Sequence, residues 1–353
     1  MSFGKALVLG LGIGVAAVAF SRPTLAREFR SSLGDQPGAG TNGSSADNVP
    51  VGIFMADQFF TDQQKLNVGP GAPFIATAGN APNLKVSVNA EVFIFNPGWN
   101  FLAATTQFII VQPFVELDTG NLPGPFGTTT VGLNNTLLKA DAAWKSGDWH
   151  VKIALGTWAP TGTQQGPVGL NNLGLPFWTI QPEFVLSWEP ETWNFTAYTY
   201  WEIATENRVT HYQNAPLFHA DFTATKTIGK WIVGPVADFV TQVGHDTSSP
   251  FYANAFVNQS CVGPVGFECL GPQNLWRWYV GGLLQYNFGP VTLQFWGTAV
   301  VASHASGASL VTAPVLHDPS VEQTGYTLWF QTSYALWMPS EPPPELKRPL
   351  IYK

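Results

Sequence analysis

The connections between the predicted strands alternate strictly between short and long, and this alternation limits the possible folds more than any other feature of the chain. About twelve runs of ten or more residues alternate between polar and apolar side chains, which is the period of a β-strand. A tilted strand that crosses a bilayer needs about 9–11 residues, so each run is long enough. The predicted strands cover residues 49–60, 83–95, 101–116, 135–144, 149–158, 176–188, 193–206, 217–226, 231–244, 276–286, 291–303 and 325–337.

The connections indicate how these strands are joined. The short ones are residues 96–100, 145–148, 189–192, 227–230 and 287–290. The long ones are residues 61–82, 117–134, 159–175, 207–216, 245–275 and 304–324. Outer-membrane barrels have short periplasmic turns and longer outer loops, whereas a soluble β-sandwich has no physical reason to sort its loops in this way. The sequence therefore predicts an all-β fold, a transmembrane antiparallel up-and-down β-barrel of about 12 strands, with both termini in the periplasm of a bacterial outer membrane.

The low charge of the chain agrees with a surface that meets lipid. Only 11% of the residues are charged and 45% are hydrophobic, whereas an ordinary soluble domain has about 25% charged residues. The net charge of −7 argues against nucleic acid as a partner, because phosphate binding needs clustered Lys and Arg side chains.

The N-terminus has the pattern of a cleaved secretory signal peptide. Lys5 supplies a positive charge, and an apolar run over residues 6–20 precedes small residues that end at Ala26. A membrane anchor is the alternative, but the run is shorter than the roughly 20 residues that a spanning helix needs. The predicted organisation is a signal peptide over 1–26, a flexible Gly- and Ser-rich segment over 27–48, the barrel over 49–337 and a Pro-rich periplasmic tail over 338–353.

Charged side chains on the polar faces of the strands are the candidate functional residues. Because polar side chains face the interior of such a barrel, we expect them to line the lumen and to set its selectivity. The alternative is that they only solvate the lumen or brace it by pairing with one another. The candidates are Lys85, Glu91, Lys139, Asp141, Lys152, Glu183, Glu202, Asp221, Asp238 and Arg277. Tyr198, Tyr200, Trp296 and Trp329 share this parity and would suit an aromatic or amphipathic solute.

Aromatic residues gather beside the short connections, for example Trp149, Trp188, Trp193 and Trp231. Tryptophan and tyrosine rings prefer the headgroup level of a bilayer, so this clustering favours an interfacial girdle over an ordinary core.

Cys261 and Cys269 are the only cysteines, and both lie in the longest connection. In an exported protein such a pair predicts a structural disulfide, and no CxxC motif or histidine cluster nearby indicates a metal site. A lipid hydrolase would need a serine activated by a histidine. His304, Ser306 and Ser309 are the nearest candidates, but Gly and Ser are ordinary loop residues there. We therefore predict no catalytic residues, no metal and no cofactor.

Three segments resemble a known family: PFWTIQPEF (176–184), ENRVTHYQNAPLFHADFTATKTIGKWIVGPVADFVTQVGHD (206–246) and RWYVGGLLQYNFGP (277–290). They are similar to outer-membrane proteins associated with the meta-cleavage pathway of phenol degradation, and the resemblance spans about residues 45 to 337. It implies a transporter or porin for hydrophobic, often aromatic, compounds and transfers no catalytic residues.

The leading hypothesis is thus an outer-membrane channel for passive passage of small hydrophobic or aromatic compounds. A plugged structural or adhesion barrel without transport is the alternative, and a lipid hydrolase is a distant third. The expected partners are outer-membrane lipid, a small-molecule solute and the barrel-assembly machinery.

Overall fold

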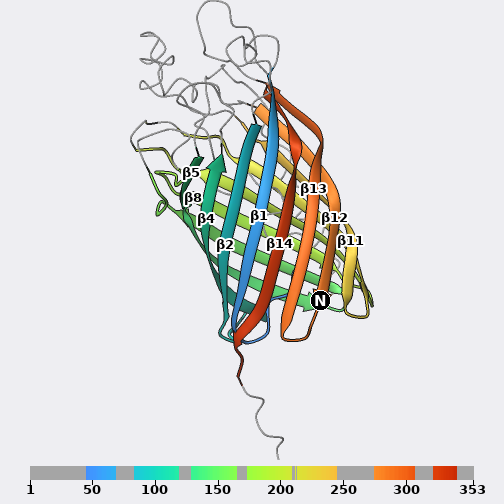
Figure 1. Ribbon diagram of the computed structural model, residues 1–353. Helices are drawn as coiled ribbons and strands as arrows, with labels where there is room; N and C mark the ends of the chain where they lie inside the picture. Colours follow the sequence, from blue (N-terminus) through green and yellow to red (C-terminus); the bar gives the residue numbers. More distant parts are fainter. Residues whose placement is uncertain are drawn as a thin grey trace, which may run out of the picture.

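The computed structural model is a closed antiparallel β-barrel (Figure 1). It describes residues 45–68, 83–118, 129–164, 173–208, 211, 213–244, 274–306 and 321–339. Twelve strands form the wall: β1 (Gly52–Val68), β2 (Asn83–Asn96), β4 (Ala104–Asp118), β6 (Thr136–Ser146), β7 (Trp149–Ala159), β8 (Thr179–Trp188), β9 (Trp193–Ala204), β10 (Leu217–Ile228), β11 (Trp231–Gln242), β12 (Asn274–Asn287), β13 (Val291–Ser306) and β14 (Val321–Trp337). Two short strands, β3 (Asn100–Phe101) and β5 (Thr129–Leu133), pair only with β4.

Each wall strand pairs with its neighbours along the chain, and β1 pairs with β14 to close the barrel. The predicted twelve-stranded, all-β transmembrane barrel is therefore confirmed, and all twelve predicted strands match a strand of the wall. Closure satisfies the backbone hydrogen bonds of every strand within the sheet, as a hydrocarbon environment requires. In the described part of the chain, no helix has the length and apolar character needed to cross a bilayer.

The short connections are tight turns at one end of the barrel, which we call the short-turn end (Figure 1). Gly147 and Gly229 occupy two of these turns with φ of +62° each, a conformation that costs glycine nothing and most other residues much more.

The strands differ in length around the barrel. β1 and β14 have 17 residues each and β13 has 16, whereas β8 has 10. The wall formed by β13, β14 and β1, which we call the tall wall, extends farther from the short-turn end than the wall formed by β7 to β9 (Figure 1).

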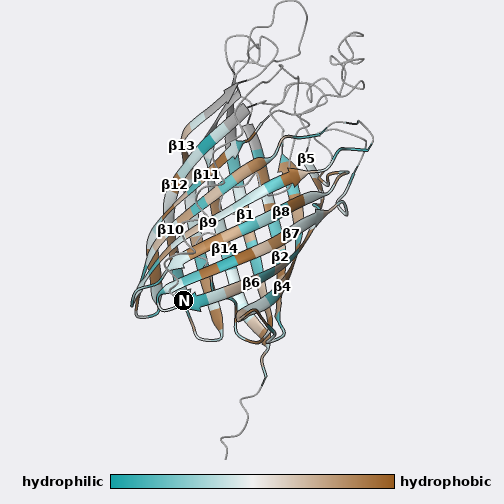
Figure 2. Cartoon of the chain, turned by 180° about the vertical axis from the view of Figure 1, so that it is seen from behind, coloured by the Kyte–Doolittle hydropathy of each residue, from teal (hydrophilic) through white to brown (hydrophobic). Residues whose placement is uncertain are grey.

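Hydrophobic and hydrophilic residues alternate along the strands (Figure 2). Burial shows that the outward face of the wall is apolar and its inward face is mixed. Phe184, Phe222 and Phe330 are exposed on the outside, while their neighbours Glu183, Asp221 and Trp329 are buried inside. Near the short-turn end, outward rings stack on one another: Trp149 on Trp188, Trp188 on Phe195 and Phe195 on Trp193. This ring of exposed aromatics agrees with the interfacial girdle that the sequence predicts.

Candidate functional site

Most of the predicted lumen charges lie inside the barrel. Seven of them are buried: Asp141, Lys152, Glu183, Glu202, Asp221, Asp238 and Arg277. An eighth, Lys139, keeps only 14% of its side chain exposed. Three of these eight side chains are basic and five are acidic, so their formal sum is 3 − 5 = −2.

The expected inward orientation is wrong for Lys85 and Glu91. Both lie on the same face of β2 as Phe93 and Phe95, which are 42% and 43% exposed on the outside. The inward face of β2 is instead small and apolar: Val86, Val88, Ala90 and Val92 are buried there. These side chains pack in an interior apolar cluster with large rings, and that packing fixes which face of β2 turns inward.

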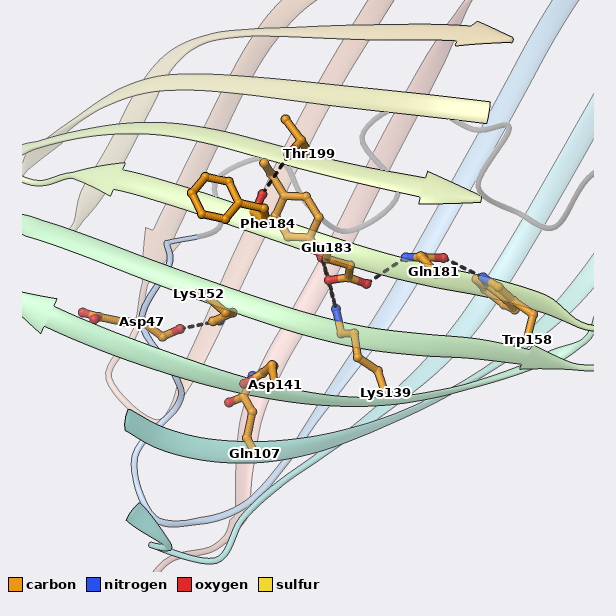
Figure 3. Close-up of polar contacts among 11 residues, drawn as sticks. Asp47, Gln107, Lys139, Asp141, Lys152, Trp158, Gln181, Glu183, Phe184 and Thr199 are labelled. Atoms are coloured by element: carbon orange, nitrogen blue, oxygen red, sulfur yellow. Dashed lines mark hydrogen bonds and ion pairs between the residues drawn. The ribbon is translucent and has the colours of Figure 1, made fainter. Parts of the chain in front are cut away.

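A network of buried polar groups joins β6, β8 and β9 (Figure 3). Lys139 Nζ lies 3.0 Å from Glu183 Oε2 and 3.2 Å from the hydroxyl of Tyr198. Glu183 also accepts hydrogen bonds from Tyr198 Oη and from Gln181 Nε2, the latter at 2.8 Å. Trp158 Nε1 donates to Gln181 Oε1 at 2.7 Å and extends the network to β7. The carboxylate of Glu183 thus contacts donors from three other side chains of the interior.

Two further charges lie beside this network. Asp141 accepts a hydrogen bond of 2.9 Å from Gln107 Nε2, and Lys152 Nζ donates to the main-chain oxygen of Asp47 at 2.8 Å (Figure 3). The candidate residues predicted from the sequence did not include Gln107, Gln181 or Asp47. Gln107 has the inward parity of its strand, so the same alternation could have identified it.

A second group of titratable side chains lies on β9, β10 and β11. Asp221 of β10 is directly opposite Asp238 of β11, and both are at most 1% exposed. His219 Nε2 lies 4.0 Å from Glu202 Oε2, and its ring stacks on Tyr200 with centroids 4.3 Å apart. Sequence reasoning did not single out His219, although its alternation with Phe218 places it on the inward face.

The opposite side of the interior is apolar. The rings of Trp296 and Trp329 stack with centroids 5.0 Å apart, and Phe60 stacks on Trp329 at 4.1 Å. This aromatic stack packs with Leu137 and Trp158 in one buried cluster. Tyr198, Tyr200, Trp296 and Trp329 thus all lie inside, as their parity predicts. The stacked rings come from β1, β13 and β14, whereas the eight inward charged candidates all lie on β6 to β12. Asp62 of β1 is a further buried acidic group, on the side of the aromatic stack.

Residues 45–49, which we call the inner segment, run against the inner wall at the short-turn end. Ala46 is fully buried against Val185, Tyr198 and Tyr200, and its main-chain N–H donates to Ser187 Oγ at 2.8 Å. Val49 N–H donates to Gln107 Oε1 at 3.1 Å. Residues 45–48, which the sequence assigns to a flexible segment, are therefore bound to the barrel wall.

A cavity of about 530 Å³ lies between the two sides of the interior and the inner segment. Lys139, Asp141 and Lys152 line it from β6 and β7. Trp329 lines it from β14, together with Gln331 of the same strand. Its volume is typical of sites that hold a small organic molecule. The predicted disulfide cysteines, Cys261 and Cys269, and the side chains of His304, Ser306 and Ser309 lie outside the described residues.

The chain matches a family model over residues 61–299. The model is described as "Putative MetA-pathway of phenol degradation". The chain belongs to this family. The resemblance inferred from its sequence segments is therefore confirmed. No curated protein sequence matches the chain.

Solved structures with a similar fold are outer-membrane barrels. An outer membrane channel from Pseudomonas putida F1 has a TM-score of 0.61 at 10% identity, and the match covers 82% of this chain and 98% of that one. The beta domain of a Bordetella autotransporter has a TM-score of 0.39 at 10% identity, with coverage of 80% and 98%. The first similarity shows that the chain has the fold of an outer-membrane channel.

Proposed function

We propose that this protein is a bacterial outer-membrane channel for small hydrophobic or aromatic compounds, with its short-turn end and both termini in the periplasm. The observation that carries the proposal is this cavity, because its lining combines aromatic and aliphatic side chains with charged and hydrogen-bonding groups. A phenol-like solute has the same division between an apolar ring and one polar group. Membership of a family named for phenol degradation supports the same class of solute.

The interior charges favour neutral solutes over anions. The eight inward charged candidates have a formal sum of −2. An anion that enters loses hydration and gains no net attraction, whereas a neutral phenol loses much less. Purified barrels in lipid vesicles should therefore admit phenol faster than benzoate, and the aromatic lining should admit phenol faster than a sugar of similar size. Protein-free vesicles measure the background from phenol's own passage through lipid.

Two charge-reversal variants distinguish the effect of interior charge on solute flux from the effect of the protein's net charge. Arg277 is 7% exposed on the inner face of β12, whereas Lys85 is exposed on the outer face of β2. Arg277→Glu should lower benzoate flux and shift the reversal potential toward cations, with phenol flux nearly unchanged. Lys85→Glu changes the net charge equally and should leave both fluxes as they are. Anion selectivity in the unmutated barrel would contradict the proposed role of the charges. No flux of any solute above background would favour the plugged structural barrel.

A further inference from the structure

Three potential metal ligands converge where the inner segment meets the barrel wall. Asp47 belongs to the inner segment, His150 to the start of β7, and Glu189 follows the end of β8. His150 Nδ1 lies 2.8 Å from Asp47 Oδ1 and 3.7 Å from Glu189 Oε1, and the donor atoms all lie within 4.8 Å of one another.

The imidazole of His150 is the observation that distinguishes this group from an ordinary cluster of carboxylates. Its side chain is 2% exposed, yet within the described residues Nδ1 forms no hydrogen bond of acceptable geometry. The distance to Asp47 Oδ1 is short enough for a hydrogen bond, but the angle is not. This buried nitrogen faces two carboxylate oxygens but is aligned for a hydrogen bond with neither of them. Ligands around a common metal ion have this arrangement.

The separations are close to those around a small divalent ion, and a small movement of the side chains would bring them into range. Zn²⁺ binds imidazole nitrogen at about 2.0–2.1 Å and carboxylate oxygen at about 2.0–2.2 Å, so two ligands at 90–110° are roughly 2.9–3.4 Å apart. The two measured separations, 2.8 and 3.7 Å, lie on either side of that range. One nitrogen and two oxygens form a donor set that suits zinc and its neighbours better than calcium or magnesium, which prefer oxygen alone.

The surrounding contacts hold the three side chains in place. The main-chain N–H of Glu189 donates to the Asp148 carbonyl at 2.8 Å, which ties the end of β8 to the start of β7. Ser45 Oγ donates to Glu189 Oε1, and Lys152 Nζ holds the Asp47 carbonyl at 2.8 Å. Hydrogen bonds of this kind orient ligands around a metal. The two carboxylates outweigh the single ammonium of Lys152, so a cation is attracted to the site.

We propose that Asp47, His150 and Glu189 form a binding site for one divalent transition-metal ion of the Zn²⁺ class. The ion would bond the inner segment directly to β7 and to the turn after β8. It would therefore determine how firmly this segment stays in the lumen, a role distinct from the passage of solute. Sequence spacing could not reveal the site, because its ligands are far apart along the chain and one precedes the first strand.

Metal binding can be measured without any transport assay. The full barrel, purified without a histidine tag and stripped with a chelator, is titrated with Co²⁺ and Zn²⁺ by absorption spectroscopy and calorimetry. We expect one ion per barrel, with Co²⁺ bands that Zn²⁺ abolishes and Mg²⁺ does not. Because loss of an outer-shell partner alone costs about 10–100-fold in affinity, His150→Ala should weaken binding by more than about 100-fold. Asp47→Asn and Glu189→Gln should each weaken it as well.

A second histidine–carboxylate pair provides the matched control. His211 Nδ1 lies 2.7 Å from Glu206 Oε1, but both side chains are exposed, at 67% and 54%. His211→Ala should retain one ion at unchanged affinity, and a heat-modifiable band on gels confirms that each variant is folded. Zinc should also protect the inner segment from proteolysis in the unmutated barrel and not in Asp47→Asn. Equal affinity in the unmutated barrel and His150→Ala, or no ion bound at micromolar zinc, would overturn the proposal and leave a simple ion pair.

Discussion

Removing the ammonium of Lys139 should destabilise the barrel more than removing any exposed lysine. Lys139 Nζ lies 3.0 Å from Glu183 Oε2, and the two side chains are 14% and 1% exposed. At an effective dielectric constant of about 20, unit charges at this separation attract by roughly 5.5 kcal/mol, of which desolvation offsets a large part. Breaking a buried pair by removing one partner costs about 3–5 kcal/mol. Glu183 keeps its hydrogen bonds from Gln181 and Tyr198, so we expect about 3 kcal/mol for Lys139→Met.

A double-mutant cycle isolates the interaction between the two charges. Lys139→Met, Glu183→Gln and the double variant are unfolded with urea from lipid vesicles, and tryptophan fluorescence reports the free energy of unfolding. We expect a coupling energy of about 2 kcal/mol, since charged groups in one network interact by about 0.5–3 kcal/mol. Lys85→Met, on the outer face, should change stability by less than about 0.5 kcal/mol. Additive effects of the two single variants, or an unchanged Lys139→Met, would refute this reasoning.

Three other predictions concern the wall, the orientation and the cysteines. A Cβ at Gly281 would lie 1.7 Å from the Gly297 carbonyl oxygen, whereas the nearest atom to one at Gly282 is 3.8 Å away; Gly281→Ala should therefore lower the unfolding temperature and Gly282→Ala should not. An epitope in the turn between β6 and β7 should escape labelling on intact cells, and one in the loop between β9 and β10 should be labelled; the reverse result would invert the orientation. We predict a disulfide between Cys261 and Cys269, so both should resist alkylation until reduced; two free thiols in the exported protein would rule this out.

The number and order of the strands could be predicted because lipid imposes a strict alternation. Four of the five short turns occur where the sequence places them, because turns favour Gly, Pro, Asn and Asp. The connection from β2 to β4 is longer than predicted and ends in a turn at Leu102 and Ala103. The far ends of the strands were less predictable. β1 was expected to end at Phe60 and continues to Val68, because Thr61 and Asp62 extend the strand with polar side chains that resemble a loop.

Local polarity does not reveal tertiary packing, and this explains why Lys85 and Glu91 were assigned to the wrong face and why other residues of the interior were missed. Polarity predicts the inward face only where the outward face must be apolar, and on β2 the packing of small aliphatic side chains against the aromatic stack decides the orientation instead. Asp47 could not be predicted as part of a site, because nothing local indicates that a Gly- and Ser-rich segment returns to the barrel interior. Its contacts with His150 and Lys152 depend on tertiary structure alone.

Because the wall differs in height around the barrel, the mouth of the barrel is open toward one side in the plane of the membrane. With a rise of about 3.3 Å per residue and a tilt of about 40°, the 10 residues of β8 span roughly 25 Å along the barrel axis and the 17 of β14 roughly 43 Å. The lipid-facing band of such barrels is about 25 Å tall, so β8 just crosses it and the tall wall projects roughly 18 Å beyond.

The exposed polar side chain of Gln63 on the projecting part of β1 agrees with a surface above the hydrocarbon, and the exposed Lys85 lies opposite it on the neighbouring β2. A neighbouring membrane protein on the side of β7 to β9 can therefore come level with the mouth, whereas one on the side of the tall wall is screened from it. In a crowded membrane, the protein that lies next to β7 to β9 therefore influences which solutes reach the mouth of the channel.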